Sequence, residues 1–120
     1  MSWDVRLTDP VTRRVLQAPR EHGIRGGTYR AGGDRELSLS ITYNYGSIFC
    51  REDVLGESGI RSLRGMTGAE SIPLLQRAIG ALGDEEDPDY WEPAEGNGKR
   101  ALCGLLAFAQ LRPDGVWEVD

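Results

Sequence analysis

Apolar residues are densest near the end of the chain, in the segment 96–111. Past Arg100 they recur at positions that cover most of a helix's circumference on a 3.6-residue period: Ala101, Leu102, Leu105, Leu106, Phe108, Ala109 and Leu111. A helix that is apolar on most sides is surrounded by other elements. We therefore predict that residues 96–111 form a central helix, against which the rest of the chain packs.

Two segments alternate apolar and polar residues, the period of a half-buried strand. In the first, 2–7, the apolar residues are Trp3, Val5 and Leu7. In the second, 36–45, one face carries Leu37, Leu39, Ile41 and Tyr43. The residues Ala31-Gly32-Gly33-Asp34 lie just before it, and their glycines suit the turn of a hairpin that joins Tyr29 to Leu37.

Weaker signals indicate two more strands. Residues 14–17 can return beside the first strand, and Pro19 then begins a predicted loop through Gly27 that contains a solvated His22. Residues 116–119 follow the turn Arg112-Pro113-Asp114-Gly115 and form a last edge strand, with Trp117 facing inward.

Further helices are predicted between the strands and the central helix. Ser47 caps a short helix that reaches Leu55, and one helical turn lies between Gly59 and Gly65. Thr67 and Glu70 have capping-box spacing, but Pro73 fits a first turn better, so the regular helix is expected from Ser71 to Gly83. The prediction is one α+β domain spanning 1–120: a small antiparallel sheet of three to five strands packed against a central apolar helix, with two further helices.

The charge of the chain limits the choice of partner. Fourteen basic and nineteen acidic residues give a formal net charge of −5, and proteins that neutralise a nucleic-acid backbone need the opposite excess. We expect no direct nucleic-acid binding. The acidic residues gather in a segment that we call the acidic segment, residues 84–95: Asp84, Glu85, Glu86, Asp87, Asp89, Glu92 and Glu95.

Cysteine usage and hydropathy predict a cytoplasmic protein. Cys50 and Cys103 are far apart in the sequence and have no metal-ligand spacing, which favours reduced thiols that are structural or semi-buried. The N-terminus lacks the pattern of a signal peptide, and no apolar run approaches the roughly 18 residues of a membrane span.

No motif indicates catalysis. The serines lack a nucleophile elbow, the cysteines lack an activating histidine motif, and the glycine pairs form neither a phosphate-binding loop nor a dinucleotide fingerprint. The run Asp84-Glu85-Glu86-Asp87 lacks the alternation of a calcium loop. We predict a protein that is not an enzyme and has no catalytic residue, metal or cofactor.

A binding site for an anion is predicted at the start of the central helix. Gly96 and Gly98 open the backbone around Asn97, a good N-cap residue, and Lys99 and Arg100 follow at once. Arg61 and Arg64 would add charge, and exposed aromatic residues would stack on a base. The predicted ligand-binding residues are Tyr43, Asn44, Tyr45, Arg61, Arg64, Trp91, Asn97, Lys99 and Arg100.

The same residues also have purely structural interpretations. The arginines would then pair with the acidic segment, the aromatic side chains would fill the core, and Tyr90-Trp91 would form a lid over that core instead of part of a ligand pocket. The sequence leaves both interpretations open.

Several short motifs together resemble a family of small proteins of bacteriophages and prophages. They are Gly26-Gly27-Thr28-Tyr29, Ile41-Thr42-Tyr43-Asn44-Tyr45, Gly59-Ile60-Arg61, Tyr90-Trp91-Glu92, Glu95-Gly96-Asn97, Lys99-Arg100-Ala101-Leu102 and Leu111-Arg112-Pro113-Asp114-Gly115-Val116-Trp117. The resemblance covers most of the chain after residue 25. It implies a phage origin and the cytoplasm of the host bacterium, and small phage accessory proteins include inhibitors of host defence.

Three functions follow as hypotheses. The first is a non-catalytic sponge that binds a small anionic, nucleotide-derived ligand to counter host defence, with the site on one chain or across a homo-oligomer interface. The second is an inhibitor that docks on a protein of a host defence complex through the acidic segment. The third is a structural component of the phage. Neutralising the acidic segment would spare the sponge and inactivate the docking inhibitor.

Overall fold

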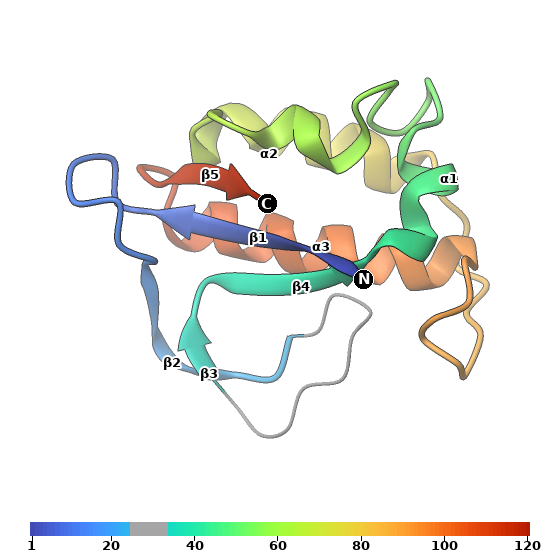
Figure 1. The fold of residues 1–120 in the computed structure, drawn as a ribbon, viewed down its shortest axis with the longest axis horizontal. Coiled ribbons are helices and arrows are strands. Elements are labelled where there is room, and N and C mark those ends of the chain that lie inside the picture. Colours follow the sequence, from blue (N-terminus) through green and yellow to red (C-terminus); the bar gives the residue numbers. More distant parts are fainter. Residues whose placement is uncertain (25–33) are drawn as a thin grey trace.

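A computed structural model describes residues 1–24 and 34–120, and the described chain has an α+β fold (Figure 1). Its elements in chain order are β1 (Ser2–Thr8), β2 (Gln17–His22), β3 (Asp34–Glu36), β4 (Ser38–Thr42), the 3-10 turn η1 (Tyr43–Tyr45), α1 (Gly46–Phe49), the 3-10 turn η2 (Gly59–Leu63), α2 (Gly68–Gly80), α3 (Glu95–Leu111) and β5 (Val116–Val119).

The main sheet has three antiparallel strands in the order β4-β1-β5. Val5, in the central strand, lies opposite Leu39 on one side and Val119 on the other. The predicted alternation is confirmed, because Trp3, Val5 and Leu7 are all buried on the face that meets the helices. The expected last edge strand is also present as β5, and Trp117 is buried.

A second, two-stranded sheet consists of β2 and β3. Residues 19–22 were expected in a loop, but they belong to β2, and the Nε2 of His22 lies 2.6 Å from the carbonyl of Glu36. Pro19 is tolerated because β2 pairs on one side only, as an edge strand. The predicted turn at Gly32 and Gly33 lies outside the described residues.

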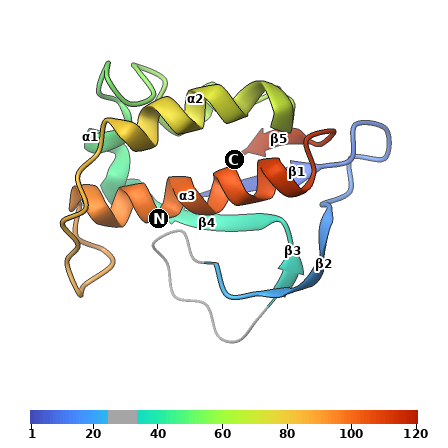
Figure 2. The same cartoon turned by 180° about the vertical axis from the view of Figure 1, so that it is seen from behind.

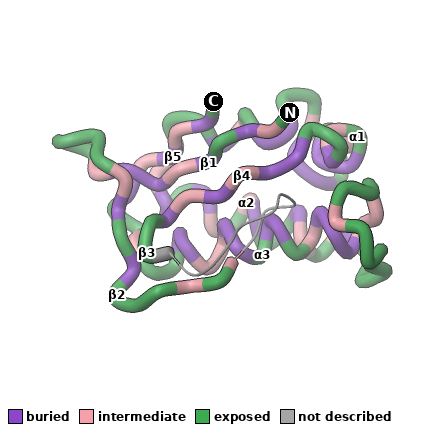
Figure 3. Tube along the Cα trace, turned by 60° about the horizontal axis from the view of Figure 1, so that its bottom comes forward, coloured by how far each residue is buried: buried purple, intermediate pink, exposed green. Residues whose placement is uncertain are grey.

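Helices α2 and α3 cover one face of the main sheet, which Figure 2 shows from the helix side. Leu105 and Phe108 of α3 are fully buried in the core, so the predicted central position is confirmed for that side of the helix. The other side of α3 is more exposed than expected, and the tube of Figure 3 alternates between buried and exposed positions along the helix. Cys103 and Leu111 are among the exposed residues. Cys50 and Cys103 are both free, as predicted, although both are exposed.

Helix α2 begins earlier than the sequence suggested. The capping box of Thr67 and Glu70 is formed in both directions, and Pro73 lies inside the helix. The expected start at Ser71 was wrong because β5 and the turn before it anchor the first turn: Gly68 N–H donates to Gly115 and Ala69 N–H to Pro113. These contacts offset the cost of the one helical hydrogen bond that is missing because Pro73 has no N–H. The helix also ends at Gly80 and not at Gly83.

The shorter helical segments differ in part from their predictions. Helix α1 ends at Phe49 and is preceded by Tyr45, so Ser47 is not its cap and the helix does not reach Leu55. The predicted turn between Gly59 and Gly65 is present as η2, and both glycines have positive φ.

Candidate functional site

The buried amide of Asn97 connects the first turn of α3 to the acidic segment. The N-cap of α3 is Ala94, so Asn97 lies inside the first turn and the predicted N-cap role is wrong. Its Oδ1 accepts a hydrogen bond from the N–H of Asp87, and its Nδ2 donates to the carbonyls of Asp89 and Glu92. Asn97 is only 1% exposed. Its side chain is therefore used to hold the acidic segment against the helix.

The positive end of α3 is closed by the chain itself. The N–H of Gly96 donates to the carbonyl of Glu85 at 2.8 Å, and the N–H groups of Asn97 and Gly98 both turn back to the carbonyl of Ala94 at 3.1 Å. A Cβ at position 96 would lie 2.6 Å from the Glu85 oxygen, so glycine permits this close approach. Main-chain carbonyls occupy the position predicted for an external anion.

The cations of α3 contact carboxylates of the acidic segment. Lys99 Nζ lies 2.6 Å from Asp84 Oδ1, and this hydrogen bond raises the pKa of Lys99. Arg100 lies 3.5 Å from Glu86. A third cation, Arg51, contacts Glu95 at 3.5 Å and is also paired with Asp53. The structural interpretation, in which arginines pair with the acidic segment, therefore holds for Arg100, and Lys99 pairs in the same way.

Two residues of η1 hold the far end of the acidic segment. Asn44 Nδ2 donates to the carbonyl of Trp91 at 2.9 Å, and the Tyr45 hydroxyl donates to the carbonyl of Tyr90. Tyr45 is fully buried, and this burial raises the pKa of its phenol. Tyr90-Trp91 thus covers a core aromatic residue, as the lid interpretation predicted, while the Trp91 side chain remains 39% exposed.

Tyr43 is the other half-exposed aromatic residue predicted for the site. Its side chain is 38% exposed, and its ring meets that of Trp3 edge-on at a centroid distance of 4.9 Å. Asn44 connects the neighbourhood of Tyr43 to Trp91 through its side chain.

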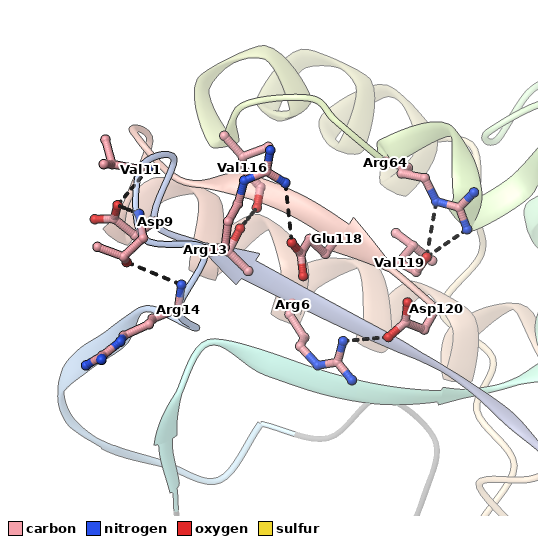
Figure 4. Close-up of polar contacts among 12 residues, drawn as sticks. Arg6, Asp9, Val11, Arg13, Arg14, Arg64, Val116, Glu118, Val119 and Asp120 are labelled. Carbon is pink, nitrogen blue, oxygen red and sulfur yellow. Dashed lines mark hydrogen bonds and ion pairs between the residues drawn. The ribbon is translucent and has the colours of Figure 1, made fainter.

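Arg64 makes its contacts at the end of β5, and not at the acidic segment. Arg64 donates from Nε and Nη2 to the carbonyl of Val119, at 3.2 and 2.8 Å (Figure 4). It lines a hollow of about 380 Å³ together with Arg13 and the end of β5. Lys99 and Arg100 line a different hollow beside Cys103. The exposed Arg61 side chain forms no hydrogen bond or ion pair with the described residues. Within the single chain, Arg64 therefore does not converge with Lys99 and Arg100.

The acidic segment carries more charge than its neighbours neutralise. A hollow of about 370 Å³ is lined by Gly83, Asp84, Glu85, Glu86, Asp87, Ala94 and Glu95. The segment has seven carboxylates, and three cations contact it: Arg51, Lys99 and Arg100. The carboxylates of Glu85 and Glu92 form no ion pair with any residue that the structure describes. The result is an exposed acidic surface with a fixed backbone.

Six of the nine predicted residues meet around this segment, namely Asn44, Tyr45, Trp91, Asn97, Lys99 and Arg100. Sequence reasoning missed other contributors to this region: the Asp89 carbonyl, which accepts from Asn97, the Glu85 carbonyl, which accepts from the N–H of Gly96, and Arg51, which contacts Glu95. One signal was available, because three segments of the phage-like resemblance, 41–45, 90–92 and 95–97, are the ones that meet here.

Comparison of the chain with protein-family models, curated proteins and solved structures gave no match. The resemblance to phage proteins thus stays a prediction.

Among residues 1–24 and 34–120, no group of three or more His, Cys, Asp or Glu is arranged to hold a metal ion. None of the described helices is long and apolar enough to span a bilayer.

Proposed function

We propose that this protein is a non-catalytic binding protein that docks on a basic surface of another protein through the acidic segment. The observation that carries the proposal is the excess of carboxylates on residues 84–95, exposed on a segment whose backbone is held at several points. Charge of one sign on a surface raises the association rate with a partner of opposite charge and suppresses binding to other acidic proteins.

The fixed conformation of the segment supports this proposal. The side chain of Asn97 bonds to the centre of the segment, and the Glu85 carbonyl accepts from the N–H of Gly96. The side chains of Asn44 and Tyr45 donate to main-chain carbonyls at its far end. A loop that is ordered before binding loses less conformational entropy when a partner docks. Connecting segments that are tied to a rigid scaffold commonly carry binding function.

The contacts of the cations favour this function over the nucleotide sponge. An anionic ligand at α3 would compete with Asp84 for Lys99 and with the Glu85 carbonyl for the end of the helix. A ligand at Arg64 would compete with the Val119 carbonyl. The sponge remains testable by calorimetry with mono-, di- and cyclic nucleotides, using Arg61→Ala/Lys99→Ala as the comparison variant.

The phage-like resemblance gives the proposal a biological setting. If the chain is a phage accessory protein, its partner is a basic protein of the bacterial host, and an inhibitor of a host defence complex is the version we favour. The cytoplasm of the host is the corresponding location. A structural role in the phage particle is the alternative.

The experiment compares two variants of equal charge. Glu85→Gln/Asp89→Asn/Glu92→Gln removes three charges from the acidic segment, and the asparagine keeps an oxygen that can accept from Trp91 N–H. Glu21→Gln/Glu52→Gln/Glu57→Gln removes three exposed charges elsewhere. Both proteins and the wild type are immobilised, exposed to a bacterial lysate, and eluted with rising salt.

The proposal expects basic proteins to be retained by the wild type and by the second variant, and to be lost from the first. Retention should fall as salt screens the charges. Equal retention by both variants would show that the acidic segment is not the docking surface. Matched melting curves establish that each variant is folded.

A further inference from the structure

The exposed Trp91 lies within the acidic segment and is held from several sides. Its N–H donates to Asp89 Oδ1 at 3.1 Å, and its carbonyl accepts from Asn44. Its ring lies against that of Tyr90, with a centroid distance of 5.1 Å and an interplanar angle of 36°. Since Tyr90 is itself held by the Tyr45 hydroxyl, Trp91 is an exposed aromatic residue on a fixed backbone.

The carboxylates nearest to Trp91 in the chain belong to the same turn. Glu92 N–H donates to the Asp89 carbonyl at 3.0 Å, so the two acidic residues are close in the fold as well as in the sequence. The carboxylate of Glu92 has no ion-pair partner among the described residues. An aromatic face combined with carboxylate oxygens is the environment that a guanidinium group prefers, because the face attracts the cation and the oxygens accept its N–H groups.

From these observations we infer that Trp91 is the anchor of the docking surface and receives an arginine side chain of the partner protein, with Asp89 and Glu92 beside it. This inference rests on the proposed function, because it specifies what the basic partner presents. Arginine is expected over lysine because its planar group stacks on an aromatic ring and donates in a fork to carboxylates. Half-exposed tryptophan is also a typical hot-spot residue of protein interfaces.

A second copy of this chain is a poor occupant of the same surface. The chain has a net charge of −5, and two acidic segments brought together repel each other. Charge complementarity therefore selects a basic partner.

The test uses two labelled peptides of equal length and charge, one alternating arginine with glycine and the other lysine with glycine. Fluorescence anisotropy at low salt measures their affinities for the folded protein. We expect the arginine peptide to bind the wild type about two- to fivefold more tightly, the size of an exposed cation–π contribution. Trp91→Leu should remove this preference while retaining salt-dependent binding of both peptides. Tyr43→Leu, which changes the other half-exposed aromatic residue, should leave the preference unchanged.

A measurement on the wild type alone guards against a variant that fails to fold. Trp3 and Trp117 are buried, so iodide quenches mainly the fluorescence of Trp91. Saturating arginine peptide should protect this fluorescence more than saturating lysine peptide does.

Equal affinities of the wild type for both peptides, equal protection from iodide, or an unchanged preference in Trp91→Leu would each overturn the inference. So would a dimer in sedimentation that Trp91→Leu dissociates. The proposed function would survive these results if Glu85→Gln/Asp89→Asn/Glu92→Gln still weakened binding of both peptides relative to Glu21→Gln/Glu52→Gln/Glu57→Gln. If those two variants bound equally, the proposed function would fail and the inference with it.

Discussion

The amide of Asn97 satisfies three main-chain groups of the acidic segment, the N–H of Asp87 and the carbonyls of Asp89 and Glu92. In Asn97→Ala the N–H of Asp87 would lose this partner, while the carbonyls of Asp89 and Glu92 would each keep one main-chain donor, the N–H of Glu92 and of Ala94. We expect the free energy of unfolding to fall by about 1–3 kcal/mol, because the three hydrogen bonds of the Asn97 amide are lost and the N–H of Asp87 is left without a partner. Urea denaturation measures the loss, and the amide of Asp87 should exchange faster with solvent. Unchanged stability would mean that water replaces the amide.

Arg13 is the only non-glycine residue of the described chain with positive φ, at 62°. It lies in the turn after β1, where Asp9 Oδ1 accepts from two N–H groups. A left-handed conformation costs a non-glycine residue about 1–2 kcal/mol because Cβ approaches the following carbonyl. Glycine avoids this cost, and the extra backbone entropy that it loses on folding is smaller, about 0.5–1 kcal/mol.

Arg13→Gly should therefore raise the free energy of unfolding by up to about 1 kcal/mol, although it removes a loose 3.8 Å contact with Glu118. Arg14→Gly is the matched control and should destabilise, since its φ is not positive. Equal effects of the two substitutions on the denaturation midpoint would argue against strain at Arg13.

Single residues were the least predictable level of this structure. The sequence singled out Asn97, because a good capping residue lies there between two glycines, but a cap depends on where the helix begins. That start is set by Glu85, whose carbonyl satisfies the N–H of Gly96 from outside the helix. No local pattern announces a contact of this kind. Tyr45 and Trp91 were predicted to serve a ligand, whereas their main contacts are within the fold.

Among the elements, α3 and the acidic segment pack closely because residue 96 is a glycine, which leaves room for the main chain of Asp84 and Glu85. A methyl group in Gly96→Ala would meet main-chain oxygens of Glu85 and Asp84 at 2.6 and 2.7 Å. We expect Gly96→Ala to lower the free energy of unfolding by about 1–3 kcal/mol, because the acidic segment must move away from α3 to make room for the methyl group.

Gly80→Ala is the control for this substitution. A Cβ at that position meets nothing within 4 Å, and the residue is helical, so stability should rise by about 0.4–1 kcal/mol. Thermal melts of both variants provide the comparison. A stable Gly96→Ala protein would mean that the segment can separate from α3 at little cost.

Elements with strong local signals were predicted well, and those that depend on distant contacts were not. The alternation of β1 is a local signal and is present. The spacing of Thr67 and Glu70 is local too, and the capping box is present although the prediction set it aside in favour of a start at Ser71. The start of α2 was misplaced, because its first turn is anchored by residues 113–115, far away in the sequence. β2 was missed for a similar reason, since its partner β3 follows a long connection.

For the molecule as a whole, stability should fall in acid. Hydrogen bonds to the charged form hold the pKa of four carboxyl groups below their usual range, those of Asp9, Asp53, Glu70 and Asp114. A lowered pKa stabilises the fold above the pKa of the unfolded chain, and the effect is lost as pH falls through the lower folded value.

The melting temperature should therefore drop between about pH 5 and pH 3. For Glu70 the main cause is the N–H of Thr67 in the capping box. Glu70→Gln keeps an oxygen for this hydrogen bond and removes the titration, so its melting temperature should depend less steeply on pH. Parallel profiles for the variant and the wild type would contradict this assignment.

The central strand β1 lies at the beginning of the chain and one of its two partners at the end. Arg6 and Asp120, which form an ion pair across these strands, are 114 residues apart in the sequence. During synthesis β1 leaves the ribosome long before β5 is made. In that interval, the edge of β1 that later pairs with β5 has unpaired backbone groups. Contacts of such wide sequence separation slow folding and lengthen the time in which an open strand can aggregate. A chaperone that covers the open edge of β1 until β5 is made would shorten this exposure.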